Sequence, residues 1–365
     1  MKFKKNDKIY QYAVKKRLIT EQSKRKFMPI IFIRLRQLLN LVQYLSFRKT
    51  INYTMLQLDY CISYCKKRLS KRRYPFFISV EPANFCNLHC PECPVGRRQN
   101  LQGAKHTMEL DLFKKLIDEL KPTLLHTIFY FQGEPLLSRQ LSEMIQYAHD
   151  AKIYTSTSTN AQLLNKEMAE KLILSGLDKL IISIDGSTQE TYETYRVGGN
   201  LQRAIDGAKQ LVELKRQLNA VNPFVEIQCL LLSSNEHQIQ EMKKLAKELG
   251  ADKLTFKTAQ FYNFENGNEL MPNNSKYSRY KKDKNGKYTL KKSLKNRCKR
   301  LWTGAVVTTE GDILPCCFDK DHSFSFGNFD KNSFIECWHS EKALRFRKNI
   351  LTNRNQFEMC RNCTS

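Results

Sequence analysis

Apolar residues between positions 76 and 257 recur as six short runs, separated by longer amphipathic stretches. Several runs are almost continuously apolar, which is typical of parallel strands buried on both faces of a sheet. The predicted strands are FFISVE (76–81), HTIFYF (126–131), IYTSTS (153–158), KLIISI (179–184), FVEIQCLLL (224–232) and KLTFK (253–257).

The stretches between these runs have helical spacing. The two clearest apolar faces are formed by Leu110, Phe113, Ile117 and Leu120, and by Ile239, Met242, Leu245 and Leu249. Asn235 is the predicted N-cap of the second helix, and Gly250 is its predicted C-terminal stop. Six strands, each followed by a helix or crossover, predict a parallel α/β sheet that is either doubly wound or a partial barrel.

Two regions come after the alternating segment. Residues 258–297 are polar, basic and rich in Asn, Lys and Tyr, which predicts a linker or long loop. Residues 298–365 form a short cysteine-rich tail, in which Gly311-Asp312 predicts a hairpin turn between AVVTT and DILPCC. With an N-terminal arm, the predicted regions are 1–75, 76–257, 258–297 and 298–365.

Positive charge is concentrated in the N-terminal arm. Residues 1–75 contain 20 Lys and Arg against 3 Asp and Glu, whereas the remainder contains 41 against 33. Around residues 28–47 apolar side chains gather on one side of a predicted helix: Ile31, Leu35, Leu38, Leu39, Val42 and Leu45. The helix either packs on the main domain with its lysines in solvent, or lies at a membrane surface, or contributes to RNA binding.

Other features of the chain narrow these interpretations. Nucleic-acid binding is the least favoured, because no recognisable RNA-binding module is present. Arg34 and Arg36 interrupt the apolar run, which argues against a membrane span, and no secretory leader is evident. A cytoplasmic protein is therefore expected, with peripheral membrane contact left open. Cys61, Cys65 and Cys229 are expected to be buried apolar residues.

The segment EPANFCNLHCPEC places Cys86, Cys90 and Cys93 in a C-x3-C-x2-C array directly after the first predicted strand. Loops that follow the strands of a parallel barrel carry its chemistry. Thiolates suit iron–sulfur clusters and zinc, and an electron-transfer cubane normally has four cysteine ligands. Three cysteines would leave one iron open to a substrate or cofactor. A zinc knuckle with a distant fourth ligand is the alternative.

The array resembles that of the radical S-adenosylmethionine (SAM) superfamily, whose fold is a partial (β/α)6 barrel. The resemblance implies a 4Fe–4S cluster on the three cysteines and SAM on the open iron. It also implies reductive cleavage of SAM to methionine and a 5′-deoxyadenosyl radical, which abstracts hydrogen from the substrate. The family usually has an aromatic residue just before the third cysteine, where this chain has Glu92.

The resemblance extends to the ends of the later strands. YFQGEP resembles the family's Gly-Gly-Glu motif, which binds the amino group of SAM in relatives. Gly133 would let the backbone approach a ligand closely, Glu134 can accept from an ammonium, and Arg196 suits the SAM carboxylate. The implied cofactor-binding residues are Gln132, Gly133, Glu134, Pro135, Ser158, Asn160, Ser183 and Arg196. Each could instead be a polar cap at a strand end.

The tail has the spacing Cys298-x12-Gly311-x4-Cys316, which resembles the opening of the SPASM domain found on many radical SAM enzymes. A full SPASM domain has more cysteines and two auxiliary clusters. Four well-placed thiols would ligate one auxiliary 4Fe–4S cluster: Cys298, Cys316, Cys360 and Cys363. Cys317 and Cys337 are spare thiols that could replace one of these, and zinc is the alternative metal.

The expected fold is an α/β partial (β/α)6 TIM-like barrel with a small SPASM-type C-terminal domain and a basic helical N-terminal arm. The expected function is that of a radical SAM enzyme with one auxiliary cluster, reduced by a donor such as a flavodoxin or ferredoxin. SPASM relatives modify peptides and proteins or oxidise sugar-like small molecules, so the substrate and the catalytic acid or base stay open. The competing hypothesis is a non-catalytic zinc or iron–sulfur scaffold, docked on RNA or membrane through the arm.

Overall fold

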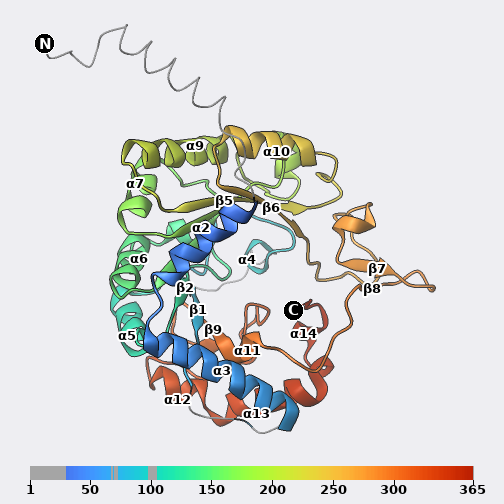
Figure 1. The fold of residues 1–365 in the computed structure, drawn as a ribbon. Coiled ribbons are helices and arrows are strands. Elements are labelled where there is room, and N and C mark those ends of the chain that lie inside the picture. The colour runs from blue at the N-terminus through green and yellow to red at the C-terminus, as the bar shows by residue number, and fades with distance from the viewer. Residues whose placement is uncertain (1–29, 67–68, 70–72, 98–104, 365) are drawn as a thin grey trace, which may run out of the picture.

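The centre of the molecule is one eight-stranded sheet, shown in a computed structural model (Figure 1). The model describes residues 30–66, 69, 73–97 and 105–364. The strand order is β10-β9-β1-β2-β3-β4-β5-β6. Among these residues, no helix combines the length and the hydropathy needed to cross a bilayer.

Six parallel strands in chain order form the partial barrel. They are β1 (Phe77–Val80), β2 (His126–Ile128), β3 (Tyr154–Thr159), β4 (Lys179–Ser183), β5 (Phe224–Leu231) and β6 (Lys253–Thr258). All six predicted strands are confirmed, and Cys229 is buried within β5 as predicted. Their near-continuous apolar character reflects burial on the helix-covered outer face as well as in the barrel.

Helices cover the outer face of the sheet (Figure 1). They are α5 (Leu110–Leu120), α6 (Leu141–Asp150), α7 (Lys166–Leu174), α8 (Gln189–Glu193), α9 (Leu201–Gln217) and α10 (Ile239–Glu248), with the 3-10 turn η1 (Pro135–Leu137). The short α4 (Pro94–Arg97) lies instead in the loop after β1, at the barrel opening. Gly250 follows α10 with φ +69°, as predicted for its stop. The predicted N-cap was wrong, because Gln238 precedes α10. Asn235 is instead buried and donates to the carbonyl oxygen of Asp185.

Residues 258–297 contain structure that the polar composition did not predict. They include the turn η2 (Ser275–Tyr277) and an antiparallel hairpin of β7 (Tyr280–Lys282) and β8 (Tyr288–Leu290). Buried aromatic residues hold this segment on the barrel, since Phe261 and Tyr280 belong to one apolar cluster with Leu88. The prediction of a plain linker or long loop therefore missed this hairpin.

The tail adds two strands to the barrel sheet. It comprises α11 (Arg300–Thr303), β9 (Gly304–Val307), β10 (Ile313–Leu314), α12 (Phe334–Trp338), α13 (Glu341–Asn353), η3 (Arg354–Gln356) and α14 (Glu358–Arg361). The predicted hairpin is confirmed, because β10 pairs antiparallel with β9 and Gly311 turns between them with φ +88°. Strand β9 also pairs in parallel with β1, from Phe77 opposite Gly304 to Val80 opposite Val307.

Candidate active site

The three cysteines of the C-x3-C-x2-C array lie in the loop that leaves β1, at the carboxyl end of the barrel strands. Cys90 is buried, and Cys86 and Cys93 are partly exposed. All three pack with an apolar cluster that includes Leu88 and Phe261. The loop turns back on itself before α4, since the Cys93 amide donates to the Cys90 carbonyl oxygen at 3.1 Å.

Several donors point at the sulfur atoms of this loop. The Leu88 amide lies 3.4 Å from Cys86 Sγ, and Asn160 Nδ2 lies 3.6 Å from the same atom. Arg196 Nη1 lies 3.9 Å from Cys90 Sγ. Hydrogen bonds to sulfur stabilise thiolates and tune the potential of an iron–sulfur cluster. This donor set fits a cluster held by three cysteines.

Burial alone would keep these thiols protonated. It raises the pKa of Cys86 to about 12, although the bond from the Leu88 amide opposes the shift. Burial also raises the pKa of Cys90, against the opposing charge of Arg196. Coordination to a metal deprotonates a thiol outright, so bound iron would stabilise the thiolate form that burial disfavours.

Glu134 connects the ends of β2 and β3 beneath the cysteine loop. Its carboxylate is only 3% exposed and accepts from the Leu136 amide, from Thr159 Oγ1 at 2.6 Å and from the Asn160 amide at 2.9 Å. Burial raises its pKa, and these bonds oppose the rise. Asn160 then donates to Asn87 Oδ1 at 2.8 Å. Glu134 and Asn160 are thus joined in one network that reaches the cysteine loop.

The other residues of the YFQGEP motif contact either the cysteine loop or the tail. A Cβ atom at Gly133 would lie 2.1 Å from the carbonyl oxygen of Ala83, so only glycine permits this approach to the cysteine loop. Pro135 is buried at the start of η1. Gln132 turns away from the loop, because its Nε2 donates to the carbonyl oxygen of Lys320 at 2.7 Å. It therefore contacts the tail.

Arg196 lies beside the cysteine loop but carries a partner of its own. Its Nε donates to Asp185 Oδ2 at 2.6 Å. Burial lowers the pKa of Arg196, yet Asp185 and Cys90 hold it above the ordinary value. Ser158 and Ser183 lie on adjacent strands, Ser158 opposite Ile181 and Ser183 opposite Gln228. The geometry therefore groups Arg196 with the cysteine loop and leaves the two serines on the strands.

Glu92 has a role that the sequence did not suggest. Its carboxylate accepts from the Tyr262 amide at 2.8 Å and from Asn268 Nδ2 at 3.0 Å, so it ties the segment after β6 to the cysteine loop. Lys320 Nζ lies 4.3 Å from the centre of the Tyr262 ring, and Arg97 lies 4.4 Å from it. No local signal could have found this contact, because Glu92 and Tyr262 are far apart along the chain.

A cavity of about 500 Å³ opens beside this contact. Its walls come from residues 260–266 on one side and from the tail segments 318–324 and 358–362 on the other. Tyr262 and Lys320 belong to its lining, so the cavity lies next to the cysteine loop. Its volume is in the range of sites for small ligands.

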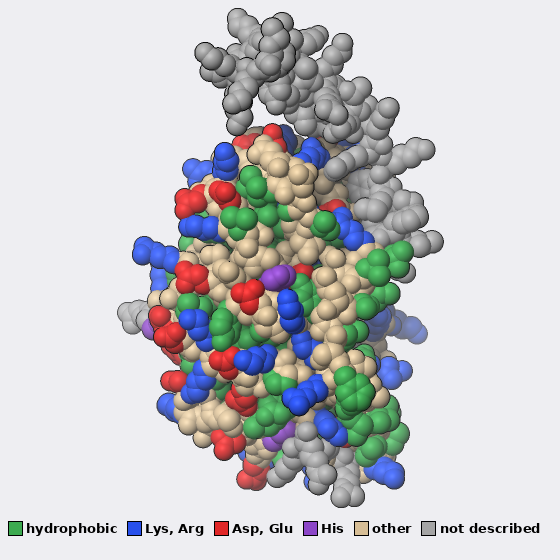
Figure 2. All heavy atoms as spheres, turned by 60° about the vertical axis from the view of Figure 1, so that its left-hand side comes forward, with side chains coloured by type: hydrophobic (Ala, Val, Ile, Leu, Met, Phe, Trp, Pro, Cys, Tyr) green, Lys and Arg blue, Asp and Glu red, His purple; other side chains and the backbone are tan. Residues whose placement is uncertain are grey.

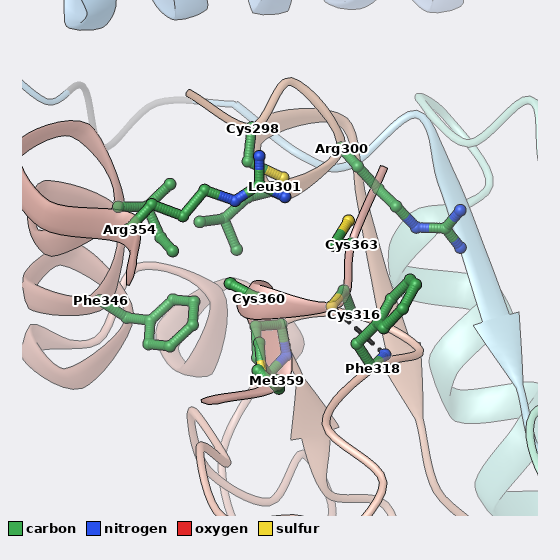
Figure 3. Close-up of a pocket in the computed structure, with 12 residues that line it drawn as sticks. Cys298, Arg300, Leu301, Cys316, Phe318, Phe346, Arg354, Met359, Cys360 and Cys363 are labelled. Carbon is green, nitrogen blue, oxygen red and sulfur yellow. Dashed lines mark hydrogen bonds between the residues drawn. The ribbon is translucent and has the colours of Figure 1, made fainter. Parts of the chain in front are cut away.

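The four thiols of the tail that were predicted to bind the auxiliary cluster line one cavity (Figure 3). They are Cys298, Cys316, Cys360 and Cys363. The Phe318 amide donates to Cys316 Sγ at 3.4 Å. Burial raises the pKa of Cys360 to about 11, and a hydrogen bond from Arg354 opposes the rise. Four thiols in one enclosed space, with N–H groups directed at sulfur, fit an iron–sulfur cluster.

The spare thiols lie elsewhere. Cys337 is buried within α12 and does not line this cavity. Cys317 is next to a ligand candidate in sequence but is also absent from the lining. It lies within electrostatic reach of Tyr130 and Lys320, on the side of the barrel. The structure therefore brings together the four thiols predicted from the spacing.

Two family models match this chain. Residues 80–253 match the radical SAM superfamily, and residues 298–364 match SPASM, an iron–sulfur cluster-binding domain. The chain is 23% identical over 316 residues to the tungsten-containing aldehyde ferredoxin oxidoreductase cofactor-modifying protein of Pyrococcus furiosus, covering 79% of this chain and 87% of the relative.

One further relative is a peptide cyclase by name, and one solved structure of similar fold is bound to a peptide. The chain is 27% identical over 200 residues to the PqqA peptide cyclase of Rhodopseudomonas palustris, covering 54% of this chain and 51% of the relative, or about half of each. The fold resembles Streptococcus suis SuiB bound to precursor peptide SuiA, with TM-score 0.57, 16% identity and coverage of 75% and 67%. With a cysteine loop at the barrel mouth and a thiol-lined cavity in the tail, the chain belongs to the radical SAM superfamily, as an enzyme that uses a 4Fe–4S cluster and SAM and carries a C-terminal SPASM domain with an auxiliary iron–sulfur cluster.

Proposed function

We propose that Cys86, Cys90 and Cys93 hold the catalytic cluster, and that the protein uses it to modify a peptide substrate. One observation carries the proposal: the three thiols lie at the carboxyl ends of the strands, ringed by Glu134, Asn160 and Arg196. When bound, the cluster with SAM supplies a 5′-deoxyadenosyl radical, which abstracts hydrogen from the substrate.

The residues around the loop would position SAM. Gly133 brings the segment after β2 against the carbonyl oxygens of Ala83 and Phe85 in the loop, which would let its backbone contact SAM closely. The remaining lone pairs of Glu134 face a buried, polar surrounding in which an ammonium would be a suitable partner. Arg196 uses Nε for Asp185 and directs Nη1 to Cys90 Sγ, and its guanidinium would also suit the SAM carboxylate. Pro135, Ser158, Asn160 and Ser183 complete the proposed SAM-contacting set.

We assign the auxiliary cluster to Cys298, Cys316, Cys360 and Cys363, as a 4Fe–4S cluster with every iron ligated by protein. Full ligation leaves no position for substrate, so its proposed role is to accept the second electron when the modification is a net oxidation or crosslink. A flavodoxin or ferredoxin is the proposed donor of the first electron.

The proposed substrate site is the cavity between residues 260–266 and the tail. It is open, lined by both polar and aromatic residues, and adjacent to Glu92 of the cysteine loop. A peptide segment could enter it with one residue directed to the barrel mouth. The peptide cyclase relative supports this substrate class above a sugar-like small molecule.

The test begins with anaerobically reconstituted protein. It should contain about eight Fe per chain and form 5′-deoxyadenosine when reduced with SAM. The variant Cys86→Ala/Cys90→Ala/Cys93→Ala should keep about four Fe and form none, because the auxiliary thiols are separate. The variant Cys61→Ala/Cys65→Ala is the matched control and should behave as wild type, since both thiols are exposed on α3 (Phe47–Lys66).

Two results would contradict this assignment. Retention of all iron by the triple variant would place the catalytic cluster elsewhere. A protein that holds zinc and never cleaves SAM would remove the assigned chemistry. For the substrate class, peptides encoded beside the gene should accelerate deoxyadenosine formation and change in mass, whereas acceleration only by sugars would reject a peptide.

A further inference from the structure

Helix α2 (Ile30–Val42) contacts the barrel through its polar side chains. Arg36 Nη1 pairs with Asp252 Oδ1 at 2.6 Å, and its Nη2 donates to a backbone carbonyl. One turn further on, Asn40 Nδ2 donates to Asn222 Oδ1 at 2.9 Å. Among the described side chains of α2, Leu41 also packs inward, against Tyr44 and Tyr154. The other inward contacts are polar, unlike those of an ordinary surface helix.

The apolar side of α2 and of the turn after it faces solvent. Its exposed residues are Leu35, Leu38, Leu39, Val42 and Leu45, from 42% to 61% exposed. Tyr44 is the inward exception on this turn, and it too docks through a polar atom. Its hydroxyl donates to Asp178 Oδ1 at 2.7 Å. The leucines predicted to share one face thus do so, but that face points away from the protein.

Helix α3 (Phe47–Lys66) repeats the arrangement. Its buried residues are Leu56 and three polar residues, Lys49, Asn52 and Ser63. Lys49 donates to the carbonyl oxygen of Lys152, Asn52 donates to that of Tyr74 just before β1, and Ser63 accepts from the Trp302 ring. Its exposed side contains Phe47, Ile51, Tyr53, Leu58, Ile62 and Tyr64, with Phe47 80% exposed. Cys61 and Cys65 lie on the exposed side as well, so the prediction that they are buried was wrong.

The exposed apolar side chains of α2, of the turn after it and of α3 make up what we call the outer apolar face: Leu35, Leu38, Leu39, Val42, Leu45, Phe47, Ile51, Leu58 and Ile62. In Figure 2, hydrophobic side chains gather along the right-hand edge, to which the helices at the front of Figure 1 have turned. Large contiguous apolar surfaces mark interaction sites, because monomeric proteins otherwise bury them.

Charge in the flanking sequence identifies the partner. Residues 1–29 contain 10 Lys and Arg against 2 Asp and Glu, and residues 66–73 contain 6 against none. An apolar face bracketed by basic segments matches an anionic bilayer, where apolar side chains enter the headgroup boundary and cations meet lipid charge. A second copy is the weaker fit, because pairing the faces would bring like charges together.

We propose that the outer apolar face of α2 and α3 docks the enzyme on an anionic lipid surface. The polar contacts of α2 and Tyr44 go to Asp178, Asn222 and Asp252, which lie one or two residues before β4, β5 and β6. The helices thus cover the amino ends of the strands, whereas the cysteine loop leaves the carboxyl end of β1. A docked enzyme would hold its active site away from the bilayer.

The experiment is co-sedimentation of the reconstituted full chain with two kinds of vesicle. One contains phosphatidylglycerol and phosphatidylcholine in equal parts, and the other contains phosphatidylcholine alone. Wild type should bind the anionic vesicles and not the neutral ones. Binding should weaken with salt, because the Debye length falls from about 10 Å at 0.1 M to about 3 Å at 1 M.

Matched variants separate the face from general stickiness. Leu38→Gln/Leu39→Gln should lower binding to the anionic vesicles by roughly tenfold or more, since two inserted leucines are lost. Leu174→Gln/Leu218→Gln changes two exposed leucines on α7 and after α9, and should bind as wild type. Both variants should keep SAM cleavage, because none of the four leucines lies in the active site.

Three outcomes would overturn the proposal. The first is no binding of wild type to anionic vesicles at low salt. The second is equal binding by Leu38→Gln/Leu39→Gln and wild type. The third is a dimer in sedimentation velocity that Leu38→Gln/Leu39→Gln abolishes while vesicles bind neither protein, which would assign the face to a second copy.

Discussion

Replacing Glu134 with alanine should destabilise the barrel mouth as well as weaken SAM binding. The carboxylate accepts three hydrogen bonds while 3% exposed, from Leu136, Thr159 and Asn160. A hydrogen bond to a charged group contributes about 1.5–3 kcal/mol, and each buried donor left alone costs about 1–3 kcal/mol. Part of this loss is offset, because alanine removes the cost of burying a charged carboxylate, the same cost that raises the pKa of Glu134.

The balance of these effects is a destabilisation of about 2–4 kcal/mol for Glu134→Ala. For a chain of 365 residues that lowers the thermal midpoint by about 3–5 °C. Glu134→Gln should lose less, about 1–2 kcal/mol, because one oxygen can still accept from Leu136 and Thr159. Only the Asn160 amide then faces a donor instead of an acceptor.

The assay is thermal unfolding of the reconstituted proteins, with iron content and the SAM dissociation constant measured on the same samples. Glu170→Ala is the control, because Glu170 is exposed on α7 and its loss should not change the midpoint. Iron should be unchanged in every variant, since Glu134 is not among the thiol ligands. A Glu134→Ala midpoint within about 1 °C of wild type would refute the network described at the barrel mouth. Full SAM affinity in Glu134→Gln would show that the carboxylate charge does not meet the cofactor.

Three further predictions concern the tail and the N-terminal helices. Deleting residues 360–365 should remove about half the iron, expose the tail to limited proteolysis and spare SAM cleavage without substrate; full iron in the truncated protein would reject the ligands Cys360 and Cys363. Arg354→Met should lower the midpoint potential of the auxiliary cluster, because the cation beside Cys298 and Cys360 favours the reduced and more negative state of the cluster. A redox titration monitored by EPR measures this potential. Arg354→Lys should lower the potential less, and an unchanged potential in both variants would exclude an effect of this cation. Burial lowers the pKa of Lys49 to about 8, below its unfolded value, so the cost of its buried charge is present below pH 8 and relieved as the pH rises toward 10.5. Between pH 8 and 10.5 the free energy of unfolding of wild type should therefore rise by up to about 3 kcal/mol relative to that of Lys49→Met, as measured by thermal unfolding at each pH. Parallel plots of unfolding free energy against pH for the two proteins would contradict this prediction.

The strands, and the grouping of the cysteines, were predictable because local sequence determines them. Each barrel strand is buried on two faces, so its apolar run is visible without knowledge of its neighbours. The thiols that share a cavity were also visible, because Cys360 and Cys363 form a close pair and the turn at Gly311 predicts a hairpin between Cys298 and Cys316. Asn235 shows the limit of this local view: its residue type suits an N-cap, but buried contacts to Asp185 place it outside α10.

Contacts between distant segments were not predictable. The periodicity of α2 gives an apolar face but does not say whether that face points inward. The answer depends on Asn222 and Asp252, which lie far along the chain and bind the polar side chains Asn40 and Arg36. The bond between Glu92 and Tyr262 has the same character. In each case the deciding partner is set by tertiary packing, which hydrophobic spacing does not encode.

The pairing of β9 with β1 affects how this enzyme can be recombined with its relatives. A tail exchanged at residue 298 would have to bring a strand that fits the outer edge of β1, since four residue pairs join the two strands. A cut at that point would leave the backbone groups of that edge without partners, and exposed edges promote aggregation. The strand that leads to Cys86 and the strand hairpin that leads to Cys316 therefore behave as one mechanical piece. Chimeras should retain β9 and β10 from the parent barrel and exchange only the residues after Cys316.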